Sequence, residues 1–211
     1  MPIDAFTPEF RAELDQLFRW RRDVRRFRTD PVPPDLVARL LEQTGRAPSV
    51  GLSEPWRWIL VETEKARAAA MESFREANAD ALSGYGGERA ARYASLKLSG
   101  MAEAPIHLAV FCDDGTDQGA GLGTATMPEM RRYSVVCAVM QLWLSARAEG
   151  LGLGWVSILH PDRLASAFGT PPDWHLIAYL CLGWPEEAHD DCELDRAGWE
   201  TRRGTGETLT V

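Results

Sequence analysis

The first part of the chain carries apolar residues at the three- and four-residue spacing of amphipathic helices. Thr7 supplies a capping hydroxyl and Pro8 suits a first helical turn, so a helix is predicted to begin there. Its apolar positions are Phe10, Leu14, Leu17 and Phe18. A proline-rich turn at residues 29–34 separates it from a second helix predicted over residues 35–45.

Apolar runs predict four strands, at residues 56–62, 106–112, 151–159 and 176–185. Helices are predicted between them over residues 64–81, 89–101 and 128–150, and a short one begins at residue 160. The helix at 128–150 has apolar residues on more than one face, which predicts that it is central and buried on most sides. This order predicts an α+β fold, an α/β sandwich with helices on the faces of a sheet.

Composition narrows the possible functions. The chain has 211 residues, 45% hydrophobic and 26% charged, which favours one globular domain. A net charge of −8 argues against a general nucleic-acid or anionic-membrane binder. The N-terminus lacks a basic region followed by an apolar core, and no apolar run reaches about 18 residues, so we expect a cytoplasmic protein without a membrane span.

The cysteines and histidines show no metal-ligand spacing, and no C-x-x-C motif is present. We therefore expect reduced thiols, mostly in the core, and no protein-bound metal. These residues are Cys112, Cys137, Cys181 and Cys192, and His107, His160, His175 and His189. Because His107 lies in an apolar strand, it is interpreted as a core residue and not as a catalyst.

Residues 21–28 concentrate five arginines around a single aspartate, Asp23. One interpretation is a solvated helix end, in which arginines complement the helix dipole and Asp23 pairs with Arg19 or Arg26. The other is a binding site for a small anion, since arginine donates paired hydrogen bonds to phosphate. The negative net charge makes so local a positive cluster notable and favours the anion site.

Two loops are further candidates. Residues 47–56 contain two prolines, a glycine and two serines directly before a strand, which fits either a plain connection or a ligand-lining loop. Residues 119–124 are glycine-rich, but their spacing does not match G-x-G-x-x-G, so a dinucleotide-binding loop is rejected. We expect residues 115–127 to form either a mobile loop over a site or a disordered surface loop.

The arginine cluster, the Ala-Pro-Ser…Pro-Trp loop at 47–56 and the Gly-Leu-Gly-Leu-Gly-Trp-Val-Ser segment at 150–157 together resemble the nitroreductase superfamily of FMN enzymes. The resemblance covers essentially the whole chain. It implies one nitroreductase-like domain over residues 1–211 with a C-terminal extension, a central mixed sheet flanked by helices, and a flavin site at a homodimer interface. It also implies that Arg21, Arg22 and Arg25 hold the flavin phosphate, with Arg203 as a further candidate.

Departures from the general pattern point to one branch of that superfamily. Asp23 stands where serine is usual, the loop lacks an Asn-x-Gln-Pro-Trp pattern, and residues 96–98 and 103–113 are similar to those of the 5,6-dimethylbenzimidazole synthases, the flavin-destructase branch. This resemblance implies an enzyme that cuts reduced FMN with O2, giving the lower ligand of vitamin B12 and erythrose 4-phosphate. The implied catalytic pair is Asp23 and Ser157.

The resemblance implies a set of flavin contacts drawn from the arginine cluster, the 47–56 loop and the later segments: Arg21, Arg22, Asp23, Val24, Arg25, Pro48, Ser49, Val50, Ser53, Leu98, Ser157 and Arg203. Neighbouring arginines lower a carboxyl pKa, so Asp23 is expected to act as a base only if it faces the ring. Ser157 has no adjacent histidine–carboxylate pair and is interpreted as a hydrogen-bond partner of the flavin or of bound oxygen, or as a structural strand serine.

Two alternatives stay open at this stage. One is an NAD(P)H-dependent nitroreductase that recycles FMN, and the other is a non-catalytic flavin carrier. Asp23 in place of serine disfavours both. The sequence also leaves open whether the protein reduces FMN with NAD(P)H or receives it reduced.

Overall fold

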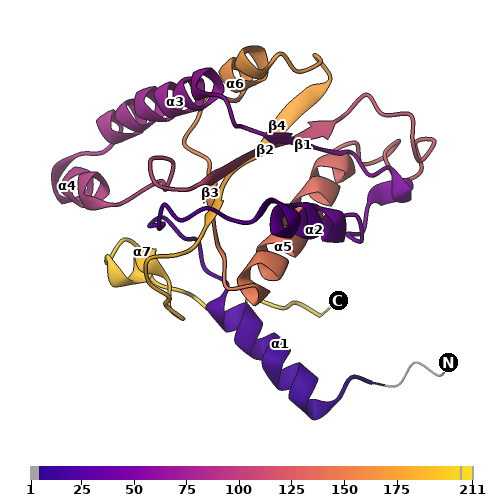
Figure 1. Cartoon of the computed structure of the whole chain (residues 1–211), viewed down its shortest axis with the longest axis horizontal. Helices are drawn as coiled ribbons and strands as arrows, with labels where there is room; N and C mark the ends of the chain where they lie inside the picture. The colour runs from indigo at the N-terminus through magenta and orange to yellow at the C-terminus, as the bar shows by residue number, and fades with distance from the viewer. Residues whose placement is uncertain (1–4, 205, 211) are drawn as a thin grey trace.

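The computed structural model describes residues 5–204 and 206–210. It contains seven α-helices, one short 3-10 helix and four strands within these residues (Figure 1). The helices are α1 Pro8–Trp20, α2 Pro34–Thr44, η1 Val50–Leu52, α3 Glu64–Ser83, α4 Gly87–Ser95, α5 Met130–Ala148, α6 Pro161–Phe168 and α7 Glu193–Arg196. The strands are β1 Trp56–Leu60, β2 Ile106–Asp113, β3 Gly152–Val156 and β4 Trp174–Gly183.

The strands form one sheet in the order β1-β2-β4-β3. All three strand pairings are antiparallel, whereas a mixed sheet was expected. The parallel component among the described residues is an isolated bridge between Asp23 and Leu153. The apolar pattern located the strands, but it carries no information on strand direction, which depends on the connections.

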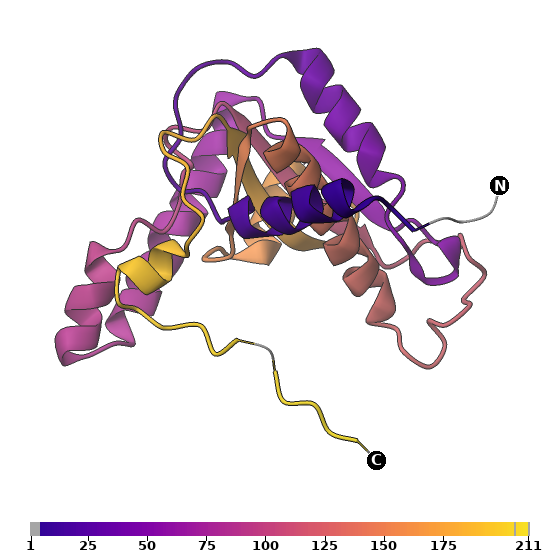
Figure 2. The same ribbon diagram turned by 90° about the horizontal axis from the view of Figure 1, so that it is seen from below.

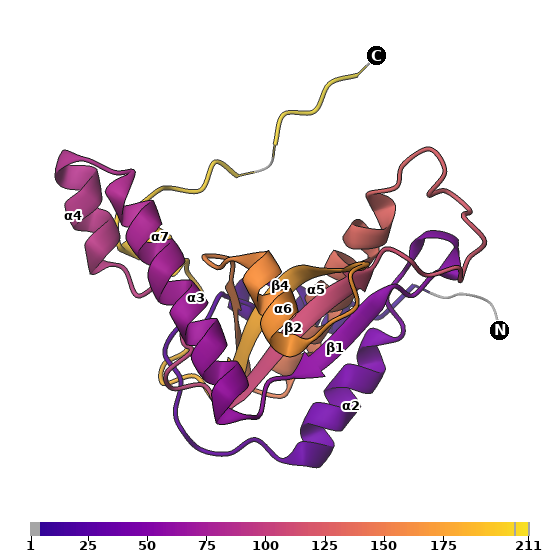
Figure 3. The ribbon, with the colours of Figure 1, turned by 90° about the horizontal axis from the view of Figure 1, so that it is seen from above.

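Helices cover both faces of the sheet, as predicted. Alternate residues of β2 point to opposite faces, so Leu108 and Val110 pack with α2 and α5 while Ala109 and Phe111 pack on the side of α3 and α6. Figure 3 shows α3 and α6 together on one side of the strands and α5 on the other. The sandwich expected from the alternation of helices and strands is therefore confirmed.

The central helix α5 is only partly enclosed. Its inner face is fully buried by the sheet, at positions that include Val135, Val139 and Leu142. The opposite face leaves large side chains exposed, namely Tyr133, Val136 and Met140. Helix α1 has no buried residue at all, although Thr7 caps it as predicted. Two apolar helix surfaces are thus left open by a single chain.

Several element boundaries differ from the prediction. The helix expected over 89–101 ends at Ser95, and the strand expected over 151–159 ends at Val156, so Ser157 is an exposed residue beyond it. The C-terminal segment adds the short helix α7 and then runs out from the body of the molecule (Figure 2). In the described part of the chain, none of the helices combines the length and apolarity needed to cross a membrane.

His107 is a core residue, as interpreted from the sequence. Its Nδ1 lies 2.8 Å from the Tyr179 hydroxyl, and burial lowers its pKa from 6.5 to about 4. Above pH 6.5 the imidazole is neutral in both states. Below it, the unfolded chain binds a proton that the folded chain does not, so stability falls as pH drops from 6.5 towards 4.

The lowering of the His107 pKa from 6.5 to about 4 corresponds to a loss of roughly 3 kcal/mol of unfolding free energy on acidification. We expect the wild-type protein to lose about that much more stability than the variant His107→Gln between pH 6.5 and pH 4. Urea unfolding at several pH values measures the difference. Parallel pH profiles for the two proteins would contradict the assignment, whatever the absolute stability of the variant.

Candidate functional site

Residues 21–28, which follow α1 and are called the arginine segment here, lie in extended form against β3 and the end of β4. Val24 N donates to Leu153 O at 3.0 Å, and Arg28 N donates to Trp184 O at 2.8 Å. Gly154 makes this approach possible, because a Cβ at that position would lie 2.1 Å from the Val24 carbonyl oxygen. The glycine-rich run of the third strand therefore serves as the surface on which the arginine segment rests.

Asp23 is fixed by two hydrogen bonds from different parts of the chain. Its Oδ1 accepts from the Trp155 backbone N–H at 2.8 Å, and its Oδ2 accepts from Arg25 Nε at 2.8 Å. The pairing with Arg19 or Arg26 that a helical segment would allow does not occur, because residues 21–28 are not helical. The carboxylate is thus held at the level of the end of β3.

Burial raises the pKa of Asp23 above its ordinary value, and this effect exceeds the opposing effects of Arg25 and of the Trp155 N–H. The lowering that the sequence suggested for a carboxylate facing arginines is present, through Arg25, but it is the smaller effect. The difference arises because desolvation penalises the charged carboxylate. One third of the side chain is still accessible, at 31% exposure, so the group can meet a ligand.

The arginines near this segment differ in whether a carboxylate neutralises them. Four of them form ion pairs with acidic residues: Arg19 with Asp190, Arg25 with Asp23, Arg26 with Glu193, and Arg28 with Asp30. Among the described residues, Arg21 and Arg22 have no carboxylate partner. Arg22 donates to the backbone oxygen of Asp190, and Arg21 lies over the Trp143 ring at 4.7 Å.

Positive charge is therefore concentrated at the start of the segment. The pKa of Arg21 is lowered first by burial and then by the charges of Arg22 and Arg202. Arg202 is brought there by the C-terminal segment, whereas the sequence had suggested Arg203. Arg21, Arg22 and Arg202 are thus near one another, and none of them forms an ion pair with a carboxylate of the described residues, which makes this a favourable site for an anion.

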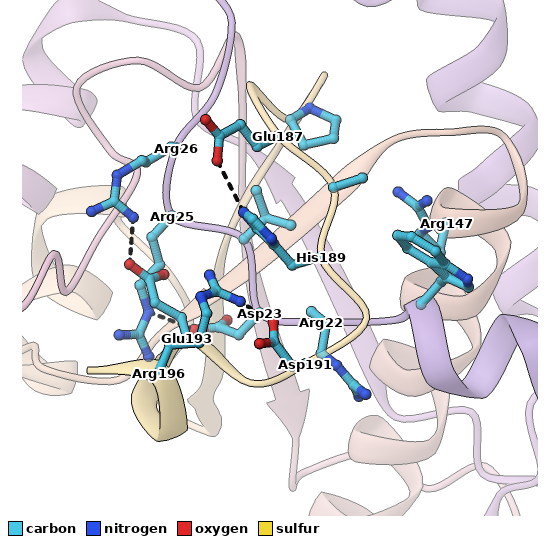
Figure 4. Close-up of a pocket in the computed structure, with 14 residues that line it drawn as sticks. Arg22, Asp23, Arg25, Arg26, Arg147, Glu187, His189, Asp191, Glu193 and Arg196 are labelled. Carbon is cyan, nitrogen blue, oxygen red and sulfur yellow. Dashed lines mark hydrogen bonds and ion pairs between the residues drawn. The ribbon is translucent and has the colours of Figure 1, made fainter. Parts of the chain in front are cut away.

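An acidic part of the C-terminal segment lies opposite the arginines. Together they enclose a cavity of about 300 Å³, which is at the lower end of the range for small-molecule sites. Figure 4 shows the acidic side chains interspersed with the arginines around it, with Glu193 beside Arg26 and Asp191 near Arg22. The acidic C-terminal segment thus neutralises Arg26 of the cluster and Arg19 at the end of α1.

Two further predicted residues lie near Asp23. Arg25 Nη1 donates to the backbone oxygen of Lys97 at 3.1 Å, which places the loop containing Leu98 beside the carboxylate. Ser157 follows Trp155 by two residues, or about 7 Å along an extended chain. The structure therefore brings Asp23, Leu98 and Ser157 into one neighbourhood.

The loop at 47–56 lies elsewhere. Val50 N donates to Ser134 Oγ at 3.0 Å near the start of α5, whereas Trp143 Nε1 donates to Arg22 O at 3.2 Å near its end. The two anchors on α5 are nine residues apart, which is roughly 14 Å along the helix. Within one chain, the predicted contacts Pro48, Ser49, Val50 and Ser53 are thus not beside Asp23.

The loop itself differs in detail from its sequence interpretation. Residues 50–52 form the 3-10 helix η1, and Ser49 Oγ accepts from Glu54 N at 3.2 Å. Ser53 is buried, with no hydrogen-bond partner for its hydroxyl among the described residues. Ser49 and Val50 remain partly accessible, and Pro48 is exposed.

Sequence reasoning missed three contributors to this site. Trp143 contacts both Arg21 and Arg22, but in the sequence it is one apolar residue of a long helix. The Lys97 backbone carbonyl carries no side-chain signal. Arg202 and Arg203 are adjacent in the sequence, and only the folded path of the tail shows that Arg202 is the one near Arg21.

Comparison with known protein families identifies the class to which this protein belongs. Residues 18–184 match the model of the nitroreductase family, and the chain belongs to that family. It is 54% identical to a 5,6-dimethylbenzimidazole synthase of Rhodospirillum rubrum over 94% of each chain. A second protein with that description, from Rhodobacter capsulatus, is 46% identical over 92% of this chain and 94% of its own. These findings confirm the resemblance drawn from the sequence, and with it the prediction of an enzyme.

Solved structures confirm the fold. An iodotyrosine deiodinase bound to FMN and 3-iodo-L-tyrosine superposes with a TM-score of 0.71 at 22% identity, covering 94% of this chain and 97% of its own. A nitroreductase-type protein of Exiguobacterium sibiricum in complex with FMN gives a TM-score of 0.62 at 18% identity, covering 90% and 91%. Neighbours with this fold bind FMN, in line with the cofactor predicted from the sequence.

Proposed function

We propose that the protein is an FMN-fragmenting enzyme that forms 5,6-dimethylbenzimidazole from reduced FMN and O2. The observation that carries the proposal is the placement of Asp23, a desolvated carboxylate held within a cluster of arginines and beside the end of β3. The relatives described as 5,6-dimethylbenzimidazole synthases support the same reaction. When bound, reduced FMN supplies the electrons that react with O2 and the ring that becomes the product.

The residues of this chain fit the phosphate end of FMN. Arg21 and Arg22 have no carboxylate partner among the described residues, and Arg202 adds a third charge. The Arg21 pKa is lowered mainly by burial and further by repulsion from Arg22 and Arg202, and a dianionic phosphate at this point would relieve that repulsion. We assign phosphate binding to Arg21 and Arg22, with the C-terminal Arg202 closing the site.

Asp23 is assigned the proton-transfer role. A base works best when its pKa lies near the working pH, and burial moves this carboxyl in that direction. Its bond from the Trp155 N–H keeps Oδ1 in a fixed place while the ion pair with Arg25 holds Oδ2. The carboxylate can therefore accept a proton at a defined position and return it.

Ser157 is assigned a hydrogen bond to the flavin or to bound oxygen, since it is exposed and free of strand pairing. We expect Ser157→Gly to lose benzimidazole formation while reduced flavin is still oxidised in air. Product analysis by chromatography, together with the flavin absorbance, measures both. If the variant gave the wild-type product yield, Ser157 would have only a structural role.

The reaction itself is tested by incubating reduced FMN with the protein in air. The flavin absorbance should be lost irreversibly, and 5,6-dimethylbenzimidazole should accumulate in the same amount. Reduced FMN in buffer alone is the control and should return fully to the oxidised spectrum. Full return in the presence of protein would refute the proposal, and NAD(P)H oxidation without ring loss would indicate a flavin-recycling nitroreductase.

We further propose that the complete site needs a second copy of the chain. The loop at 48–53 lies roughly 14 Å along α5 from the arginine segment, so one chain does not supply both sets of contacts. The exposed apolar strip of α5 and the unburied α1 provide surface for a partner copy. Light scattering should give a dimer mass, and a monomer with full activity would contradict this arrangement.

A further inference from the structure

Arg25 differs from the other arginines of the cluster in how completely its side chain is engaged. Nε donates to Asp23 Oδ2 at 2.8 Å, and Nη1 donates to Lys97 O at 3.1 Å. Its side chain is 13% exposed, against 52% for Arg26 and 55% for Arg28. It is thus a largely enclosed guanidinium that connects two separate segments.

We propose that Arg25 is a positioning residue, which holds the Asp23 carboxylate and the Lys97–Leu98 loop in one arrangement and leaves phosphate binding to Arg21 and Arg22. This inference rests on the proposed function, in which Asp23 transfers a proton. It departs from the phosphate-binding role that the position of Arg25 in the sequence motif implied.

Charge balance supports this division. A phosphate would compete poorly for Arg25, because leaving Asp23 without its partner would strand a desolvated carboxylate. Arg21 and Arg22 carry no such cost, since their contacts are an aromatic ring and backbone oxygens. The cluster therefore contains two kinds of arginine with separate tasks.

The second anchor of Arg25 is itself braced. Lys97 Nζ lies 2.5 Å from Glu103 Oε1, and both side chains are about one third exposed. This ion pair joins the two ends of the loop that carries Leu98. Arg25 connects that loop to Asp23, so the loop and the carboxylate are kept at a fixed separation.

The groups that face Asp23 come from several elements. Burial is the largest effect and raises its pKa, as does the charge of Glu193, whereas Arg25 and the Trp155 N–H lower it. Cys181 also lies close enough to interact with the Asp23 charge. Removing Arg25 takes away the largest charge effect that favours the ionised carboxylate.

The test compares three arginine variants of the full-length protein: Arg25→Gln, Arg22→Gln and Arg28→Gln. Arg28 is the matched control, because its Nε also pairs with an aspartate two residues away, at the same 2.8 Å, but in solvent. Three quantities are measured: FMN affinity by flavin fluorescence, the pKa of Asp23 by carboxyl NMR, and benzimidazole yield.

For Arg25→Gln we expect FMN affinity to stay within about threefold of wild type, while the pKa of Asp23 rises by about 1 to 3. For Arg22→Gln we expect FMN affinity to fall by at least about tenfold, since a charge-assisted contact to phosphate is lost, with little change in the Asp23 pKa. Arg28→Gln should leave all three quantities unchanged.

A loss of FMN affinity in Arg25→Gln equal to that in Arg22→Gln would overturn the inference, and so would an unchanged Asp23 pKa. Arg25→Lys separates positioning from charge. Its positive charge should bring the Asp23 pKa part of the way back down from its value in Arg25→Gln. It should not restore the product yield, because lysine has no planar fork to hold both partners. If the wild-type protein forms no benzimidazole, the proposed function fails, but affinity and pKa still test the role of Arg25.

Discussion

The variant Asp23→Asn should form no detectable 5,6-dimethylbenzimidazole while it still binds FMN. Asparagine has the shape of aspartate, and its side-chain oxygen can still accept the hydrogen bond from Trp155 N. It cannot take up a proton at neutral pH. Because positioned acid–base groups contribute about 10²- to 10⁴-fold, we expect the product yield to fall by at least about 100-fold.

The same variant should leave flavin affinity within a few-fold of wild type, since Arg21 and Arg22 do not contact the Asp23 side chain in the described structure. Flavin fluorescence measures affinity, and chromatography measures product. Asp30→Asn is the matched control, because Asp30 pairs with Arg28 in solvent and has a lowered pKa. Normal product yield from Asp23→Asn would remove Asp23 from the mechanism.

The pH dependence of the wild-type protein provides a second test of this role. The pKa of Asp23 is raised by burial, so product formation should decline on acidification at a pH above the ordinary range of an aspartate. The sign follows from the base role: protonation of the carboxylate removes the acceptor. A profile that stays flat down to the ordinary aspartate range would contradict it.

Much of the fold followed from the sequence because the elements are long and strongly patterned. The central helix, the buried strand at residues 106–113 and the capped first helix were all located from apolar spacing. The direction of the strands was not, and neither was the end of β3 at Val156. Both depend on how distant segments pair.

The candidate site was predictable in its residue types and less so in its contacts. Arg26 pairs with Glu193 across 167 residues, and Arg19 pairs with Asp190 across 171, so the sequence could not show which arginines remain without a carboxylate. The net direction of the Asp23 pKa could not be foreseen for the same reason, because the burial that raises it is created by tertiary packing. The sequence reveals the cluster of arginines, but only the fold shows which of them are paired with carboxylates and which are available to bind an anion.

The loop at 48–53 shows a different limit. Its residues resemble a flavin-binding loop, yet one chain holds them roughly 14 Å along α5 from Asp23. A single sequence does not tell whether two motifs of one site come from the same copy or from two. The open apolar face of α5 gives the physical reason to expect two.

Gly154→Ala should disrupt the site from beneath. The added Cβ would lie 2.1 Å from the Val24 carbonyl oxygen, which belongs to the backbone and cannot turn aside as a side chain could. Overpacking of this kind costs about 1 to 3 kcal/mol, which lowers the melting temperature by several degrees in a protein of this size. Thermal unfolding followed by circular dichroism measures it.

The larger expected effect of Gly154→Ala is on function. Val24 lies between Asp23 and Arg25. A backbone shift there would therefore move the Asp23 carboxylate away from Trp155 N and would also disturb the rest of the arginine segment. We therefore expect both FMN affinity and product yield to fall, unlike in Asp23→Asn, where affinity is kept. Gly206→Ala is the control, since no atom of the described part of the chain lies within 4 Å of its added Cβ. Unchanged melting temperature and affinity in Gly154→Ala would show that the arginine segment does not depend on this close approach.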